Sequence, residues 1–593
     1  VSYPASVATV QSHTYKRGNV TMNATVPHTV TGGFDIGDVS GDNGDLTLAS
    51  GSLTVNTSVN VGDASGSAGV LTVNGASATV AVIGATSDLN VGRAGTGTLE
   101  IFGGGQITVA DDFIVGSTAT GDGAATISGG TGSLPNIIRS KLQTTSTTTG
   151  DVIIGNSGVG TLELTNGGVV NCGRDLKLAP NLGATGDVSA SGSFSVFQSA
   201  IVVGRNFDIA RNDTVLSAGS ASVVLTSPAT AVVHGVTRIG DLNGGLGTLR
   251  LSGGQITSDG GIEISSNGVL NGTGAVDADI ANFGRVEPEG VNGLFMIGLL
   301  SNTTNNVVGT KIFFGGTGAY VGSGTCNADI AGDSTSSITA TGELFIGRNT
   351  TSGYFYLGTL NVGANTVHLV DSNGAVLGGL TQISGGQLEC TTGIGVQNGG
   401  EIRGVGPVIG NVTASGVLDP HLDTVDGGLL TINGDLLMNP TGIVDMEIGG
   451  TPQSGRNDRI NITGTAAFNG SVRVRLKNGY IPRVGEQFIV ANATGGRSGE
   501  FAAILPPTGA FAPCNNVTFV LVYSSTAAIV LVRPPLGCTA LGDLNSDGQH
   551  NGRDVQIFVN NLLNGSYDAC ADMNGDCSDD VNDIPNFLQS LVN

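Results

Sequence analysis

The sequence predicts an all-β protein, a β-solenoid of the right-handed parallel β-helix type, with a strand-rich C-terminal cap and a small α-helical domain after it. Three observations lead to this fold class. Glycine makes up 98 of 593 residues, far above ordinary usage. A short strand–turn–strand frame returns many times along the chain. Two acidic twelve-residue loops stand close to the end.

The repeated frame is an apolar strand ending in glycine, a small polar turn and a second strand of the type Gly-Thr-Leu-x-Leu. Copies start at Phe34, Val59, Leu89, Val152 and Thr237, with a weaker one at Leu344. The strand-ending glycines of successive copies are Gly37, Gly62, Gly92 and Gly116, which lie 25, 30 and 24 residues apart. A repeat of this length is typical of solenoids.

The physical character of the repeat fits stacked strands. Alternation with period two places Leu, Val and Ile inside and Thr, Ser and Asn outside, and glycine suits corners that need a positive φ. One coil cannot bury its own apolar face, so each coil must pair with the next and the ends need caps.

Changes in composition and in the repeat pattern divide the chain into four segments. These are an N-terminal cap or exchanged strand at 1–32, solenoid repeats at 33–433, a C-terminal β cap at 434–533 and a separate domain at 534–593. The segment 517–532 predicts two strands around a turn, and Pro534-Pro535 then stops strand pairing. The stretch from Gly434 resembles the terminal β-helix coils of autotransporter-like passenger proteins.

The C-terminal loops have the ligand spacing of calcium-binding loops. In the first loop, oxygen ligands fall at positions 1, 3, 5, 9 and 12, position 7 offers its carbonyl, and Gly548 provides the sharp turn at position 6. The second loop follows the same spacing but has Cys577 in place of that glycine. The candidate calcium ligands are Asp543, Asn545, Asp547, Gln549, Asn551 and Asp554 in the first loop and Asp572, Asn574, Asp576, Ser578, Asp580 and Asp583 in the second.

Each loop precedes an apolar stripe with helical spacing, at Val555, Phe558, Val559 and Leu562 after the first. This pair of loops and helices, with Asp at position 12, resembles the dockerin module found on large exported proteins of planctomycete-type bacteria. The resemblance covers about residues 537–593. It implies two bound calcium ions and coupling to a cohesin-like or other surface protein, or to another copy of this chain.

The net charge and the cysteine positions limit the partners and the location that we expect for this protein. A net charge of −23 argues against nucleic-acid and anionic-membrane partners, and no apolar run is long enough to span a membrane. The absence of an initial Met suggests a removed export signal, so we expect a secreted or cell-surface location. We expect a disulfide near the C-terminus, Cys538 with Cys570 first, whereas Cys172, Cys326 and Cys390 have no close partner in sequence and are equally well explained as buried thiols.

Catalysis is disfavoured by the residues available. The six histidines are dispersed and tryptophan is absent. The carboxylate pairs Asp111-Asp112 and Asp277-x-Asp279 are better explained as a solvated edge. We therefore predict a non-enzymatic, self-assembling subunit of a surface filament or layer. An adhesin or glycan-binding stalk is the alternative, followed by a polysaccharide-active enzyme.

Overall fold

The computed structural model describes most of the chain. It covers residues 9–24, 26–132, 137–191, 198–212, 218–290, 292–302, 307–308, 311–316, 318–326, 329–332, 334–347, 354–356, 358–370, 372–422, 427–505, 517–534, 538, 540–574 and 578–592. The chain forms two compact units, Val1–Ser336 (unit 1) and Ser337–Asn593 (unit 2).

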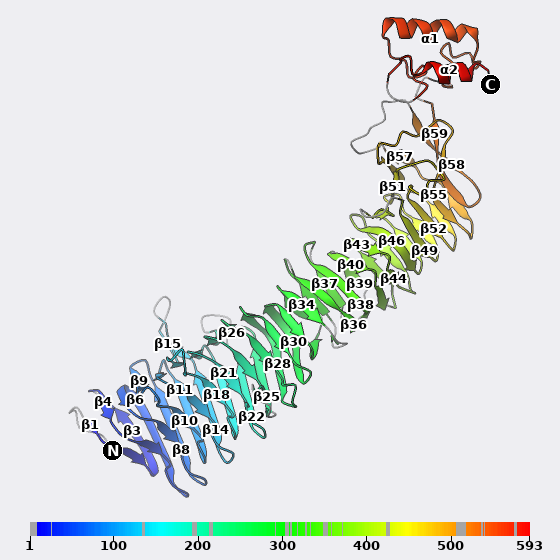
Figure 1. Ribbon diagram of the computed structural model, residues 1–593. Coiled ribbons are helices and arrows are strands. Elements are labelled where there is room, and N and C mark those ends of the chain that lie inside the picture. Colours follow the sequence, from blue (N-terminus) through cyan, green and yellow to red (C-terminus); the bar gives the residue numbers. More distant parts are fainter. Residues whose placement is uncertain are drawn as a thin grey trace. The chain divides into compact units, whose positions relative to one another are not determined.

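Unit 1 is built of coils, most of which add one strand to each of three parallel sheets (Figure 1). The first sheet contains β2 (His13–Tyr15), β5 (Phe34–Ile36), β7 (Val59–Val61), β10 (Leu89–Val91), β13 (Phe113–Val115), β18 (Val152–Ile154), β21 (Leu176–Leu178), β24 (Phe207–Ile209), β27 (Thr237–Ile239), β29 (Ile262–Ile264), β31 (Ile280–Asn282), β34 (Leu299–Asn302) and β36 (Ala319–Cys326).

The second sheet of unit 1 contains the Gly-Thr-Leu type of strand. It consists of β3 (Arg17–Asn23), β6 (Asn43–Val55), β8 (Ala68–Asn74), β11 (Thr96–Phe102), β14 (Asp122–Ser128), β19 (Val159–Thr165), β22 (Thr185–Ala190), β25 (Ser220–Thr226), β28 (Leu246–Ser258), β30 (Gly268–Asp277) and β32 (Arg285–Pro288).

The third sheet of unit 1 completes each coil, and the long strands β6, β28 and β30 continue into it. Its other members are β1 (Thr9–Val10), β4 (His28–Val30), β9 (Ala78–Val82), β12 (Gln106–Val109), β17 (Lys141–Thr144), β20 (Val169–Cys172), β23 (Ala200–Val203), β26 (Thr230–Val233), β33 (Leu294–Met296), β35 (Lys311–Phe314) and β37 (Asp329–Gly332). A two-stranded antiparallel sheet, β15 (Gly130–Thr131) with β16 (Ile138–Arg139), lies between β14 and β17 in the chain.

The core of unit 1 consists of columns of identical positions. Leu89 lies opposite Val59 in the preceding coil and Phe113 in the following one, and all three side chains are fully buried. Burying such a side chain stabilises the fold by about 1.5–3 kcal/mol. Because each column is completed only by neighbouring coils, the coils stabilise one another, which confirms the predicted β-solenoid architecture.

The repeat glycines form a column at the corner after the first sheet. Gly37, Gly62, Gly92 and Gly116 have φ values of 74°, 69°, 67° and 69°, as the sequence predicted. A Cβ atom on Gly92 would lie 2.3 Å from the carbonyl oxygen of Asp122 in the next coil. Both the dihedral angle and the close approach of the next coil therefore require glycine here.

A second column satisfies backbone donors at the start of the first-sheet strands. The residue before each strand accepts a hydrogen bond from the backbone N–H of its counterpart one coil later. We name Ser58, Asp88, Asp112, Asp151, Asp175 and Asn206 the Asx column. For example, Asp151 N donates to Asp112 Oδ1 over 2.7 Å. These carboxylates thus stabilise the stacking of coils rather than forming only a solvated edge.

Residues of the predicted N-terminal segment, 1–32, take part in the same stacking. Strand β2 pairs in parallel with β5, and β3 and β4 pair with the two halves of β6. Within the described residues from 9 onward, this segment therefore supplies the first coil of unit 1.

Unit 2 also contains three parallel sheets. Its short-strand sheet consists of β39 (Tyr354–Tyr356), β42 (Ala375–Leu377), β45 (Ile394–Val396), β47 (Val412–Ala414), β50 (Leu436–Met438), β53 (Ala466–Phe468) and β56 (Arg497–Gly499). Its second sheet consists of β38 (Ser337–Gly347), β40 (Thr359–Gly363), β43 (Leu380–Ser384), β46 (Glu401–Ile409), β48 (Val417–Asp419), β51 (Ile443–Ile448), β54 (Ser471–Leu476) and β57 (Ala503–Leu505).

The third sheet of unit 2 contains the later halves of β38 and β46. Its other parallel members are β41 (Thr366–Val370), β44 (Gln387–Glu389), β49 (Leu429–Asn433), β52 (Arg459–Ile462) and β55 (Gln487–Ala493). Strand β59 (Ala527–Arg533) then pairs antiparallel with both β55 and β58 (Thr518–Tyr523). This confirms the two strands predicted at 517–532 and ends the parallel stacking on that sheet.

A helical module follows, with helices α1 (Gly552–Asn564) and α2 (Ile584–Ser590). The predicted disulfide between Cys538 and Cys570 is present, with a Cα–Cα separation of 5.6 Å. Cys172 and Cys390 are buried free thiols, whereas Cys514 and Cys577 lie outside the described residues. Within the described part of the chain, no helix has the length and apolar character needed to cross a membrane.

Candidate functional site

The first acidic loop gathers its carboxylates around buried positions 1 and 12. Asp543 and Asp554 are both fully buried. Asp543 accepts hydrogen bonds from the backbone N–H of Asp547 and Gly548 over 3.0 and 2.8 Å. Gly548 adopts φ of 79°, as expected for the sharp turn at position 6. The loop therefore encloses the two carboxylates that begin and end the predicted ligand set.

The last residue of the loop also begins the helix. Asp554 Oδ2 accepts from Asn551 N over 2.9 Å, and the Asn551 side chain accepts from Arg553 N. The Asn551 side chain also accepts from the backbone N–H of Asp554, and this bond together with the one from Asn551 N to Asp554 forms a capping box at the start of α1. Of the remaining predicted ligands of this loop, Asn545 is half-buried and Asp547 and Gln549 are exposed, and Asp547 Oδ1 accepts from Gln549 N.

The second loop repeats one arrangement of the first. Asp583 Oδ1 accepts from Asn574 N and its Oδ2 accepts from Asp580 N, each over 2.9 Å. Asp554 makes the corresponding bonds to positions 3 and 9 of its own loop. Asp572 and Asp583 are buried, at 1% and 0% exposure. Ser578 is exposed, and Asp576 lies outside the described residues.

The two loops are held together by a small apolar core. Phe558 of α1 stacks on Phe587 of α2 with ring centroids 4.0 Å apart, and Ala571 completes the buried cluster. Val555 and Leu562 pack against it as the stripe predicted. The inclusion of Val559 in that stripe was wrong, because its side chain is 42% exposed and does not pack against this core.

The loop residues fit a bound divalent cation chemically. Their donors are carboxylate and carboxamide oxygens, the ligands that calcium prefers. Among the described side chains, none forms an ion pair with Asp554 or Asp583, although both are fully buried. Burying an ionised carboxylate without a cation is costly. Burial and the neighbouring carboxylates also raise the pKa of Asp579, inside the second loop, to about 6.

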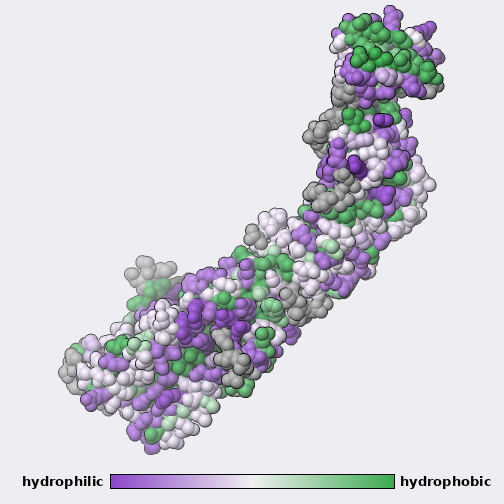
Figure 2. All heavy atoms as spheres, in the orientation of Figure 1, coloured by the Kyte–Doolittle hydropathy of each residue, from purple (hydrophilic) through white to green (hydrophobic). Residues whose placement is uncertain are grey.

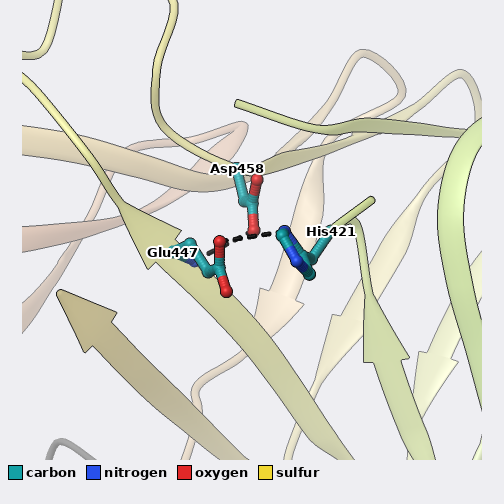
Figure 3. Close-up of side chains that lie close together, drawn as sticks. All are labelled: His421, Glu447 and Asp458. Atoms are coloured by element: carbon teal, nitrogen blue, oxygen red, sulfur yellow. Dashed lines mark hydrogen bonds and ion pairs between the residues drawn. The ribbon is translucent and has the colours of Figure 1, made fainter. Parts of the chain in front are cut away.

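A second cluster of ligand-type side chains, not predicted from the sequence, lies in unit 2. His421 follows β48, Glu447 belongs to β51, and Asp458 directly precedes β52 (Figure 3). One ligand atom from each residue lies within 4.8 Å of those of the other two. Their exposures are 6%, 9% and 1%, so the cluster is almost closed to solvent.

The backbone and one lysine position this cluster. Asp458 Oδ1 accepts from Gly428 N over 2.6 Å and its Oδ2 accepts from Glu447 N over 3.0 Å. His421 Nδ1 lies 2.9 Å from Glu447 Oε2. Lys477 Nζ lies 2.9 Å from the same oxygen and 3.4 Å from His421 Nδ1. Burial raises the pKa of Asp458 to about 6.

Ion pairs surround the cluster in a chain that otherwise has few charges. Arg475 contacts Asp419 over 2.9 Å and Asp445 over 2.8 Å. Arg473 also pairs with Asp445, and Arg403 with Asp419. Asp458 also lines a cavity of about 300 Å³ together with Gly428, Asn457 and Phe488. The cluster is thus joined to the ion-pair network by a contact of 3.7 Å between Arg475 and Glu447, and it borders the cavity through Asp458.

One signal in the sequence could have indicated part of this cluster. Glu447 lies 26 residues after His421, within the repeat spacing, so the two were candidates for stacked positions in adjacent coils. Asp458 belongs to a connection between β51 and β52 whose conformation the repeat does not predict. The carboxylates weighed for catalysis are elsewhere: Asp277 and Asp279 are exposed, and Asp112 belongs to the Asx column.

Comparisons with known proteins place the chain in no family. No protein-family model matches it, and no curated protein matches it significantly. One similar solved structure is the TibC-catalysed, hyper-glycosylated TibA55-350 fragment. It is 14% identical, covers 70% of this chain and 96% of that chain, and has a TM-score of 0.17. At that score the similarity supports no argument about function.

Proposed function

We propose that this chain is an extracellular structural protein, a β-solenoid subunit of a surface filament or layer, coupled to its partner through a calcium-dependent C-terminal module. The observation that carries the proposal is the duplicated geometry of the two acidic loops. In both, the position-12 Asp is fully buried and holds the backbone of positions 3 and 9. Two calcium ions bound there would stabilise the loops and the helices that follow them.

The surface of the module supports a coupling role. Large apolar side chains are 42–78% exposed on it, and hydrophobic residues gather on the module in Figure 2. They are Val559, Leu563, Tyr567, Val581, Leu588 and Val592. So many exposed apolar side chains on a small domain favour a protein partner. We propose another copy of this chain as that partner. Only 12% of the residues are charged, so few charged side chains would lose their hydration when copies pack closely together.

The proposed role is non-enzymatic. The carboxylates considered for catalysis have structural partners, since Asp112 accepts from Asp151 N and Asp279 accepts from Leu299 N. Both bonds join one coil to the next, which is a use suited to a structural protein.

Calcium titration of the chelator-treated full-length protein by calorimetry tests the first half of the proposal. We expect two bound calcium ions, with Asp554→Asn and Asp583→Asn each losing one, because each removes the buried carboxylate that closes its loop. Asp122→Asn, an exposed carboxylate on β14, is the control and should leave both sites intact. Absence of calcium binding by the unmodified protein would refute the module's role.

Light scattering and negative-stain microscopy test the second half. The full-length protein should form polymers in calcium and dissociate in excess chelator, and the double variant Asp554→Asn/Asp583→Asn should stay monomeric. A full-length protein that binds calcium but is monomeric in every condition would exclude self-assembly and leave a different surface protein as the partner.

A further inference from the structure

The cluster of His421, Glu447 and Asp458 has the composition of a metal site. It combines one imidazole nitrogen with two carboxylates, donors that together suit zinc and related divalent transition metals. We propose that these three residues bind one divalent transition-metal ion of the zinc class, and that the Lys477 ammonium group holds the position when the metal is absent.

The distances allow one ion to contact all three side chains. Ligand bonds to zinc are about 2.0–2.2 Å long, which places the ligand atoms of one tetrahedral shell roughly 3.5 Å apart. The candidate ligand atoms lie within 4.8 Å of one another, and His421 and Glu447 already approach to 2.9 Å. The adjustments needed are therefore within the reach of small side-chain rotations.

The ligands are also held in place before any ion binds. Each oxygen of Asp458 accepts one backbone N–H bond and keeps a second lone pair for a metal. Glu447 is fixed on the central strand of three stacked neighbours, β48, β51 and β54. This preorganisation lowers the cost of closing a coordination shell.

The local charge favours a divalent cation over the lysine alone. Among the described residues, Asp458 forms no ion pair, whereas the carboxylates of Asp419, Asp445 and Glu447 each contact a basic group. Glu447 is contacted by Lys477 over 2.9 Å and by Arg475 over 3.7 Å, so among the described residues of the cluster the carboxylate of Asp458 is the one without a basic ion-pair partner. The Lys477 side chain is 32% exposed, so it can move into solvent when a metal enters. The cavity beside Asp458 supplies space for a water molecule as the fourth ligand.

Asp458 is the last residue of the connection between β51 and β52, whereas His421 and Glu447 belong to the stacked coils. A bound ion would therefore link this connection to the coils beside it. The site is separate in sequence from the C-terminal loops. It does not depend on the proposed calcium module.

Zinc titration by calorimetry, with the full-length protein in saturating calcium, tests the site. We expect one zinc ion per chain, and cobalt in its place should give visible absorption bands that report a nitrogen ligand. Affinity should fall at least 100-fold in His421→Gln and Asp458→Asn, and Asp122→Asn should match the unmodified protein. The double variant Asp554→Asn/Asp583→Asn should retain zinc binding at this site.

Lys477→Met supplies the decisive comparison, because it removes the competing cation and leaves all three ligands. Zinc should bind this variant at least ten-fold more tightly than the unmodified protein. The proposal is overturned if zinc binding is absent in both proteins, if Lys477→Met weakens it, or if His421→Gln binds zinc as tightly as the unmodified protein.

Discussion

At the scale of single residues, the corner glycines show how the repeat is specified. Gly92 has φ of 67° and its missing Cβ would meet a carbonyl oxygen at 2.3 Å, whereas Gly129 has φ of 69° with open space around it. The two glycines therefore share the dihedral requirement but differ in steric contact. They form a matched pair for separating backbone strain from a clash between coils.

We predict that Gly92→Ala destabilises unit 1 by about 2–4 kcal/mol, because it adds a clash to an unfavourable dihedral angle. Gly129→Ala should cost about 1 kcal/mol, from the dihedral angle alone. Chemical denaturation followed by circular dichroism measures both. Equal effects of the two substitutions would mean that contact between coils at Gly92 contributes nothing.

Asp112 in the Asx column makes stability depend on pH. Burial raises its pKa to about 6, against the opposing hydrogen bond from Asp151 N, and its ordinary value is near 3.8. The folded state thus holds the proton more tightly than the unfolded state. The stabilisation of the folded state that comes from this tighter proton binding is fully present below pH 3.8 and is lost as the pH rises through 6.

We predict that Asp112→Asn, which keeps an oxygen acceptor for Asp151 N, removes the loss of folding stability that Asp112 causes as the pH rises. Between pH 4 and 7 the variant should gain about 1 kcal/mol over the unmodified protein, a figure reduced for the partial exposure of Asp112. Thermal denaturation across this pH range provides the measurement. A constant difference between the two proteins at every pH would contradict the assignment.

At the scale of elements, the helical module has a very small apolar core. Only Phe558, Ala571 and Phe587 form its buried cluster within the described residues, so other links must contribute to its stability. The disulfide between Cys538 and Cys570 is one such link and spans 32 residues. The buried carboxylates of the two loops are the other, if calcium binds them as proposed.

We predict that Cys538→Ser/Cys570→Ser lowers the stability of the module by about 2–4 kcal/mol, because an open chain gains entropy when it unfolds. Hydrogen exchange should then accelerate in α1 and α2 and stay unchanged in the strands of unit 1. Protection of α1 equal to that in the unmodified protein would show that the loops and core suffice.

At the scale of the whole molecule, charge limits the possible partners. The net charge of −23 repels anionic surfaces at long range. We predict that the protein in chelator does not sediment with phosphatidylserine vesicles at about 0.15 M salt, where repulsion is screened beyond about 8 Å. Neutral vesicles are the control. Binding to the anionic vesicles alone would require a basic surface that the composition does not suggest.

The solenoid and the loop spacing were predictable because they depend on local, periodic features. Strand alternation, the corner glycines at Gly37 to Gly116 and the ligand spacing from Asp543 to Asp554 can all be recognised without knowing which coils touch. The same locality predicted the disulfide, since Cys538 and Cys570 lie in one short domain.

By itself, the sequence thus determined the coil architecture and the acidic loops, while the tertiary structure decided which side chains of different coils meet. Coils differ in length, with repeat glycines 24 to 30 residues apart, so the stacking register cannot be counted from the repeat alone. That register makes Asp112 an acceptor for Asp151. It also brings His421 beside Glu447, while the connection after β51 returns Asp458 to the same point.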